Sequence, residues 1–301
     1  MERISFHDQI SKNKRKSFFL IIIIFLVFVL IGYIISLALN PSYFFIIMIM
    51  AIIFSISYLL IGYYNSDKIA LKSVNAKPAS RQEYPQYHNL VEGLCLASGM
   101  PKPKLYIMED ENINAFASGR DPQHSVICVT KGALNKLNKQ ELEGVLGHEL
   151  SHIANYDIRF MTLTAVLVGM IAIISQIFLR SLWFQSFSGG NRDRNQSQLI
   201  FIAIGVLLAI LAPIFVSLVQ LSISRKREYS ADASSVKFIR SPTGLINALK
   251  KIQKDTNINE KQKINKAIAP LFISDPFKKK IENAFSTHPS LEKRIKILER
   301  M

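Results

Sequence analysis

The stretch that decides the fold and the chemistry of this 301-residue chain is Val145-Leu146-Gly147-His148-Glu149-Leu150-Ser151-His152-Ile153. It contains the pattern His-Glu-x-x-His. Residues i and i+4 of an α-helix project from nearly the same side, so His148 and His152 can bind one metal ion together. Glu149 can then act on water as a general base. The stretch predicts a helix with two metal ligands and a base. The alternative is a helix that merely contains two histidines.

The residues upstream predict where this helix begins. Asn138 suits an N-cap position, and Glu141 three residues later completes a capping box. Apolar residues follow at helical spacing and predict a face that packs against a core: Leu142, Val145, Leu146, Leu150 and Ile153.

Long apolar runs flank the metal-binding motif. Hydrophobic residues make up 49% of the chain, more than is usual for a soluble protein. Residues 17–39 and 43–64 carry no charge, are each long enough to cross a bilayer, and are separated by a short turn. A signal peptide would have a shorter run and a small-residue cleavage site. Residues 160–179 and 199–223 predict a second, slightly more polar hairpin, so the sequence predicts four transmembrane helices.

Charged residues predict the orientation of these helices. Basic residues cluster at the N-terminus, after residue 64 and at 225–227, which places both termini and the metal-binding helix in the cytoplasm by the positive-inside rule. Arg192 and Arg194, in the predicted outer loop, weakly oppose this. The net charge of +15 is explained by contact with the lipid bilayer, so we predict no nucleic-acid partner. Cys95 and Cys128 lie in apolar contexts and are expected to be free thiols in a reducing compartment.

A hydrolytic zinc site usually has three protein ligands and one position for water, so two histidines are not enough. Asn155 and Asp157 are weak candidates for the third ligand. Glu228 and Asp232 are better placed, at i and i+4 on a predicted helix that follows the fourth apolar run. One carboxylate can bind the metal while the other accepts the N–H of a ligating imidazole. Taken alone, the pair also fits a solvated helix beside neighbouring arginines.

Four blocks of the sequence, in this order, resemble the HtpX-like membrane zinc metallopeptidases, which are relatives of the CAAX-prenyl endopeptidases. The blocks are Asn114-Ala-Phe-Ala-Ser-Gly119, His148-Glu-Leu-Ser-His152, Arg227-Glu-Tyr-Ser-Ala-Asp232 and Thr287-His-Pro-Ser-Leu-Glu-Lys-Arg294. The resemblance covers essentially the whole chain. It implies one Zn2+ per chain, with these site residues: His148, His152 and Glu228 as ligands, Glu149 as general base and Asp232 as the partner of a ligand.

The same resemblance implies roles for the first and last blocks. Asn114 and Ala115 correspond to an edge-strand segment that pairs with the substrate backbone, although an ordinary strand or turn is the alternative. His288 and Arg294 are implied to stabilise the oxyanion. The alternatives are that His288 caps the final helix and that Arg294 is a solvated charge. The remaining histidines match no motif and are predicted at the surface: His7, His88 and His124.

The resemblance also implies the fold class. We expect an α+β membrane protein, with four transmembrane helices plus a mainly helical zincin catalytic domain that contains a small mixed β-sheet. A helix at 87–98 and strands at 104–108 and 126–130 are predicted in that domain. The predicted segments are 1–66, the basic arm and transmembrane hairpin 1; 67–159, the first half of the catalytic domain; 160–223, transmembrane hairpin 2; and 224–301, the second half with the third ligand.

The function implied is that of a membrane-anchored zinc-dependent endopeptidase. Members of the family cleave misfolded or damaged membrane proteins in envelope quality control, a stress response. The expected partners are unfolded or membrane protein substrates and the lipid bilayer, and self-cleavage is expected. The expected location is a bacterial cytoplasmic membrane, with a multi-pass chain and a cytoplasmic active site. The alternative is a non-proteolytic adaptor or holdase, which the intact Glu149 disfavours. Prenyl-protein processing is disfavoured because that branch carries more spans.

Overall fold

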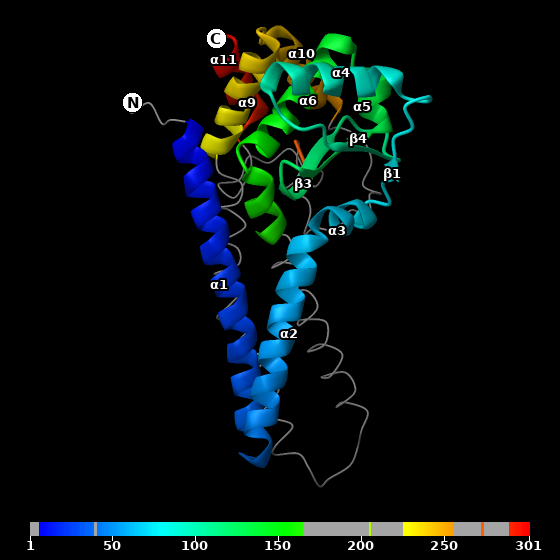
Figure 1. Ribbon diagram of the computed structural model, residues 1–301. Coiled ribbons are helices and arrows are strands. Elements are labelled where there is room, and N and C mark those ends of the chain that lie inside the picture. The colour runs from blue at the N-terminus through cyan, green and yellow to red at the C-terminus, as the bar shows by residue number, and fades with distance from the viewer. Residues whose placement is uncertain (1–5, 39–40, 165–204, 206–224, 256–271, 274–288) are drawn as a thin grey trace.

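The structure, a computed structural model, describes residues 6–38, 41–164, 205, 225–255, 272–273 and 289–301 (Figure 1). In chain order, the elements are α1 (Phe6–Ala38), η1 (Pro41–Tyr43), α2 (Phe44–Tyr64), α3 (Ser66–Ser73), β1 (Lys77–Pro78), α4 (Pro85–Ser98), β2 (Lys104–Met108), β3 (Ala115–Asp121), β4 (His124–Thr130), α5 (Lys131–Lys136), α6 (Lys139–Ala154), α9 (Arg225–Ile239), α10 (Thr243–Asp255) and α11 (Leu291–Leu298). Nearly all of the predicted second hairpin, 160–179 and 199–223, lies outside the described residues.

Helices α1 and α2 form an antiparallel hairpin that projects away from the rest of the described chain (Figure 1). Each contains an apolar stretch of 21 residues, which is long enough to cross a membrane. Many of the apolar side chains point outward; Phe45, for example, is 77% exposed. Where the two helices meet, the rings of Phe28 and Tyr58 pack edge to face, with centroids 5.0 Å apart. The first predicted hairpin is therefore present as two candidate membrane helices whose outward surface suits lipid.

A four-stranded sheet lies at the centre of the remaining domain, in the order β1-β2-β4-β3. The pair β2–β4 is parallel, and the pairs β1–β2 and β3–β4 are antiparallel, which confirms the small mixed sheet. Residues 104–108 of β2 pair in register with residues 126–130 of β4. The two predicted strands are thus next to each other, and β3 forms the edge of the sheet that faces away from β1.

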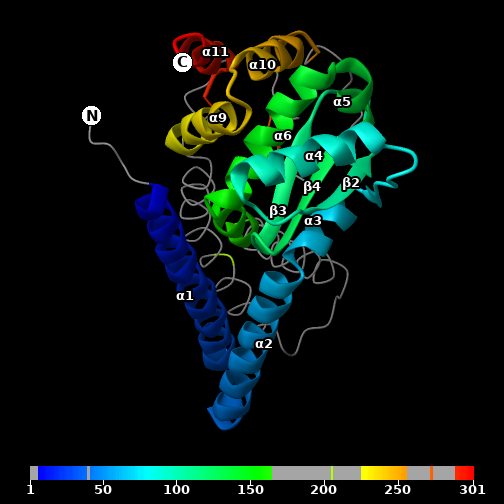
Figure 2. The ribbon, with the colours of Figure 1, turned by 45° about the horizontal axis from the view of Figure 1, so that its top comes forward.

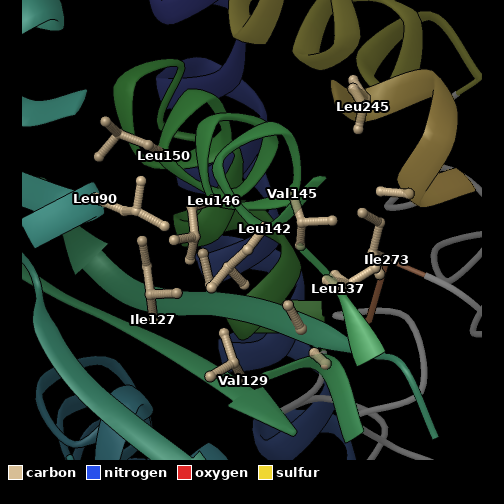
Figure 3. Close-up of a cluster of buried hydrophobic side chains, with 14 of the residues drawn as sticks. Leu90, Ile127, Val129, Leu137, Leu142, Val145, Leu146, Leu150, Leu245 and Ile273 are labelled. Carbon is tan, nitrogen blue, oxygen red and sulfur yellow. The ribbon is translucent and has the colours of Figure 1, made fainter. Parts of the chain in front are cut away.

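The main core lies between this sheet and the helices α4, α6 and α10. Leu142, Leu146 and Leu150, spaced along one side of α6, are at most 2% exposed. Leu142 and Leu146 point toward the sheet, and Leu150 lies near Leu90 of α4 (Figure 3). Burial of each such leucine contributes about 1.5–3 kcal/mol. Helix α4 lies across the sheet (Figure 2), and its Tyr87 hydroxyl donates to the Ile127 carbonyl oxygen at 3.0 Å. This core fixes α6, and with it the metal-binding motif, relative to the sheet.

Two glycines let α6 approach its neighbouring helices closely. A Cβ atom on Gly144 would lie 2.5 Å from the backbone nitrogen of Leu245 in α10, and one on Gly147 would lie 2.7 Å from Ser235 Oγ in α9. The Ser235 hydroxyl donates to the Gly144 carbonyl oxygen at 3.0 Å. Helix α9 is therefore held directly beside the His-Glu-x-x-His turn of α6, which brings Glu228 next to the two histidines.

Candidate metal centre

The helix that carries the two histidines begins as its sequence predicts. The Glu141 backbone N–H donates to Asn138 Oδ1 at 2.9 Å, and the Asn138 backbone N–H donates to Glu141 Oε2 at 2.8 Å, so the capping box is complete. The helix ends at Ala154, two residues after the motif. The predicted start of the metal-binding helix is therefore confirmed.

Helices α6 and α9 bring three potential ligands together. One ligand atom each of His148, His152 and Glu228 lies within 4.8 Å of the other two, and the three side chains are buried. The two Nε2 atoms are 3.2 Å apart, and the Glu228 carboxylate oxygens lie 3.5 Å from His148 Nε2 and 3.7 Å from His152 Nε2. In a tetrahedral zinc site with bonds of about 2.0–2.2 Å, ligand atoms are about 3.3–3.6 Å apart. The nitrogen and oxygen donors therefore fit this metal in both chemistry and spacing.

Each histidine has its own carboxylate partner on the ring nitrogen that faces away from the group. His148 Nδ1 lies 2.9 Å from Asp232 Oδ1, and His152 Nδ1 lies 3.0 Å from Asp157 Oδ2. A carboxylate that accepts Nδ1–H leaves Nε2 unprotonated and free to bind a metal. Asp232 lies where its predicted role requires. Asp157, which the sequence offers as a weak ligand candidate, is instead placed as the partner of His152.

Arg294 lies inside the site with its side chain fully buried. Its Nε and Nη2 atoms donate to the two oxygens of Asp232 at 2.9 and 2.6 Å, and Nη1 lies 3.4 Å from Glu228 Oε2. Burial lowers the pKa of Arg294, but the charge of Asp232 outweighs it and raises the pKa above the usual value. Burial likewise raises the pKa of Asp232, yet Arg294 and His148 keep it below the usual value. The alternative of a solvated arginine is wrong.

The charges of the site shift the pKa values of the motif residues. Burial and the nearby Arg294 lower the pKa of His148. The carboxylates of Asp232 and Glu228 outweigh them, so the pKa of His148 is raised to about 9. Glu149 is 1% exposed, and burial raises its pKa above the usual value even though the two histidines lower it. A raised pKa makes this carboxylate a stronger proton acceptor than an exposed glutamate.

The predicted substrate segment lies on the edge strand β3, but its backbone already has partners. The Ala115 N–H donates to Asn114 Oδ1 at 3.0 Å, and the Ala115 carbonyl oxygen accepts from the Ile273 N–H at 3.0 Å. Phe272 bridges to Phe116 in antiparallel register, with ring centroids 5.2 Å apart. The strand therefore has the expected edge position, and a short stretch of the same chain lies along it.

The structure describes two of the remaining predicted histidines, His88 and His124, away from the metal centre. His288 lies outside the described residues, so its role stays a prediction. His124 is exposed and pairs with Asp121 at 2.7 Å, while His88 is half-buried, with Nε2 3.0 Å from the Ala79 carbonyl oxygen.

Comparisons with known proteins identify a family and several similar proteins. A family model described as Peptidase family M48 matches residues 81–301. A protein named Protease HtpX homolog from Thermoanaerobacter pseudethanolicus is 42% identical over 300 residues, which are 99% of each chain. Another of that name, from Dictyoglomus thermophilum, is 40% identical over 301 residues, which cover 100% of this chain and 96% of the relative. The crystal structure of Ste24p from S. mikatae aligns with 83% of this chain and 57% of that chain, with a TM-score of 0.49 and 19% identity.

Proposed function

The chain belongs to peptidase family M48 and is a membrane metalloprotease, and from this premise we propose that it is a zinc-dependent endopeptidase with one zinc ion per chain. The observation that carries the proposal is the buried group of His148, His152 and Glu228, whose separations of 3.2–3.7 Å match the spacing of zinc ligands. We assign these three residues as the ligands. Zinc supplies, when bound, a Lewis acid that polarises the scissile carbonyl group and lowers the pKa of water.

The side chains around the ligands transfer protons and orient the ligands. Glu149 takes a proton from the attacking water at its carboxylate and passes it to the nitrogen of the leaving amine. Asp232 holds His148, and Asp157 holds His152, with Nε2 of each ring directed to the ion. Arg294 donates hydrogen bonds to Asp232 and lies beside Glu228, so we assign it the role of positioning these two carboxylates. His288 remains our proposed donor to the oxyanion.

We place the substrate along β3, beside Asn114 and Ala115. An extended peptide adds to a sheet edge through main-chain hydrogen bonds, and only an unfolded segment is extended enough to do so. A bound peptide replaces the Ile273 N–H as the hydrogen-bond donor to the Ala115 carbonyl oxygen. This supports misfolded or damaged membrane proteins as substrates in envelope quality control. A second copy of the chain is a substrate of the same kind, hence the proposed self-cleavage.

The proposed location is a bacterial cytoplasmic membrane, crossed by four helices that include residues 160–179 and 199–223. The N-terminal part of α1 lies beside the catalytic helices (Figure 1). The metal centre is therefore on the same side of the hairpin as the chain's N-terminus. The basic residues near that end, among them Lys14 and Arg15, favour the cytoplasmic side.

The test is proteolysis of casein, an unfolded reporter, by the purified full-length protein. We compare wild type with Glu149→Gln, both loaded with zinc, because this change keeps the shape and the ligands but removes the base. Cleavage by wild type, abolished in the variant and by chelator, is the expected result. Stoichiometric zinc binding without cleavage of casein or of membrane substrates by either protein contradicts the proposal and favours a non-proteolytic holdase.

A further inference from the structure

One polar side chain of the first candidate membrane helix, α1, contacts the residues next to the metal centre. The apolar stretch of α1 begins at Asn13, whose side chain is only 6% exposed. Its Nδ2 atom donates to Asp157 Oδ1 at 2.7 Å and to the Asn155 carbonyl oxygen at 3.0 Å. The other oxygen of Asp157 lies 3.0 Å from His152 Nδ1. Two consecutive hydrogen bonds therefore link α1 to a proposed zinc ligand.

The turn that α1 contacts has an unusual backbone. Tyr156, between Asn155 and Asp157, has φ of 58°, in the left-handed region that costs a residue with a Cβ atom about 1–2 kcal/mol. This conformation ends α6 and returns the chain so that Asp157 faces His152. Asn13 donates to the residue on each side of Tyr156, and the ammonium group of Lys14 lies 4.4 Å from the centre of the Tyr156 ring. Two consecutive residues of α1 thus brace the strained turn.

We propose that Asn13 is a positioning residue for His152, so that the first membrane helix sets the geometry of the metal centre. The proposal rests on the proposed function. Asp157 is 1% exposed, and without Asn13 one of its oxygens loses a charge-assisted donor in a site from which water is excluded. The carboxylate then rotates or the turn relaxes, and either movement releases the His152 ring from the orientation that directs Nε2 to the ion.

The alternative is that Asn13 only attaches α1 to the catalytic domain. Zinc affinity separates the two roles, because simple attachment stabilises the protein without changing the ligand geometry. Ser17 provides a matched control: it lies four residues later on the same side of α1 and is fully buried, and its hydroxyl has no hydrogen-bond partner among the residues that the structure describes. Ser17→Ala perturbs the helix contact and leaves Asp157 untouched.

The experiment measures the zinc dissociation constant of the full-length protein by competition with a chromophoric chelator, together with the visible absorption spectrum of the cobalt-substituted protein. Removal of a partner of a metal ligand weakens binding by about 10–100-fold, and Asn13 is one step farther out, so we expect Asn13→Ala to raise the dissociation constant about tenfold. We also expect a changed cobalt spectrum. Ser17→Ala is expected to match wild type in both.

A pair of variants keeps the test decisive if Asn13→Ala folds poorly. Asn13→Asp places two carboxylates against each other and is expected to weaken zinc binding more than Asn13→Ala does. Adding Asp157→Asn restores the contact with donor and acceptor exchanged, while the amide oxygen still accepts from His152. The double variant is expected to bind zinc more tightly than Asn13→Asp alone.

The outcomes distinguish this proposal from the proposed function. If wild type binds zinc and Asn13→Ala has the same dissociation constant and cobalt spectrum, the positioning role is wrong and the proposed function stands. A double variant that binds zinc no better than Asn13→Asp does the same. Wild type that binds no zinc overturns the proposed function, and the positioning role with it.

Discussion

Arg294→Met tests how the metal centre is held together. The change keeps an unbranched side chain of similar length and removes the guanidinium group. In the structure this group donates to both oxygens of Asp232 and lies 3.4 Å from Glu228 Oε2, and all three side chains are at most 4% exposed. The variant therefore leaves two buried carboxylates without their shared cation.

The expected cost is large. Removal of one partner from a buried ion pair costs about 3–5 kcal/mol, because the remaining charge has lost that cation in a poorly solvated site. For a protein of this size, such a loss lowers the melting temperature by roughly 6–20 °C. Bound zinc supplies a positive charge at Glu228, so we expect a smaller loss in the zinc-loaded protein than in chelator. We also expect weaker zinc binding, because Asp232 no longer holds His148 in place.

The assay is thermal unfolding of the detergent-solubilised protein, with zinc and with chelator, alongside the zinc dissociation constant and the rate of casein cleavage. Arg81→Met is the control, because Arg81 pairs with Glu92 at the surface and its loss is expected to leave the melting temperature nearly unchanged. If Arg294 serves only the oxyanion, the variant loses kcat while its melting temperature and zinc affinity match wild type. That result would refute the positioning role.

Two further substitutions test the ligand partner and the helix contact. Asp157→Ala removes the acceptor of His152 Nδ1 and is expected to raise the zinc dissociation constant about 10–100-fold by chelator competition; an unchanged value means that packing alone orients the ring. Gly144→Ala places a Cβ atom 2.5 Å from the Leu245 backbone and is expected to lower stability by at least about 1–3 kcal/mol in thermal unfolding. The control is Gly93→Ala in α4, where no atom of another described residue beyond its chain neighbours and its own helix lies within 4 Å of the new Cβ, and it is expected to stabilise by about 0.5–1 kcal/mol. Equal changes in stability for the two variants contradict the close-contact argument.

The features that the sequence predicts correctly depend on neighbouring residues. The capping box needs only Asn138 and Glu141, and the structure contains both of its hydrogen bonds. The apolar runs at 17–39 and 43–64 require only length and the absence of charge, and both form helices. The pairing of Glu228 with the two histidines is different, since helix periodicity leaves it open and only the resemblance to a family selects it.

The contacts that the sequence does not predict join segments that are far apart in the chain. Asp157 reaches His152 only because Tyr156 adopts a left-handed backbone, a conformation that no propensity of tyrosine indicates. Asn13 lies 144 residues from Asp157 in the chain. A polar residue at the start of an apolar run predicts only where the membrane helix begins. Arg294 lies among surface charges in the sequence, yet α11 directs it inward. None of these contacts has a local signal.

The balance of charge explains why partners so distant in sequence are needed around one small group. Among the described residues, the centre gathers four buried carboxylates: Glu149, Asp157, Glu228 and Asp232. Two guanidinium groups lie close enough to act on them, Arg294 within the site and Arg227 beside it. With all four carboxylates ionised and both histidines neutral, as metal ligands are, this leaves an excess of two negative charges in a poorly solvated space, which one divalent cation balances. Carboxylates packed this closely repel one another, so they require donors or cations close by. Asn13 donates to Asp157 without adding a charge that would compete with the metal, which is why an amide rather than a third cation suits the end of α1.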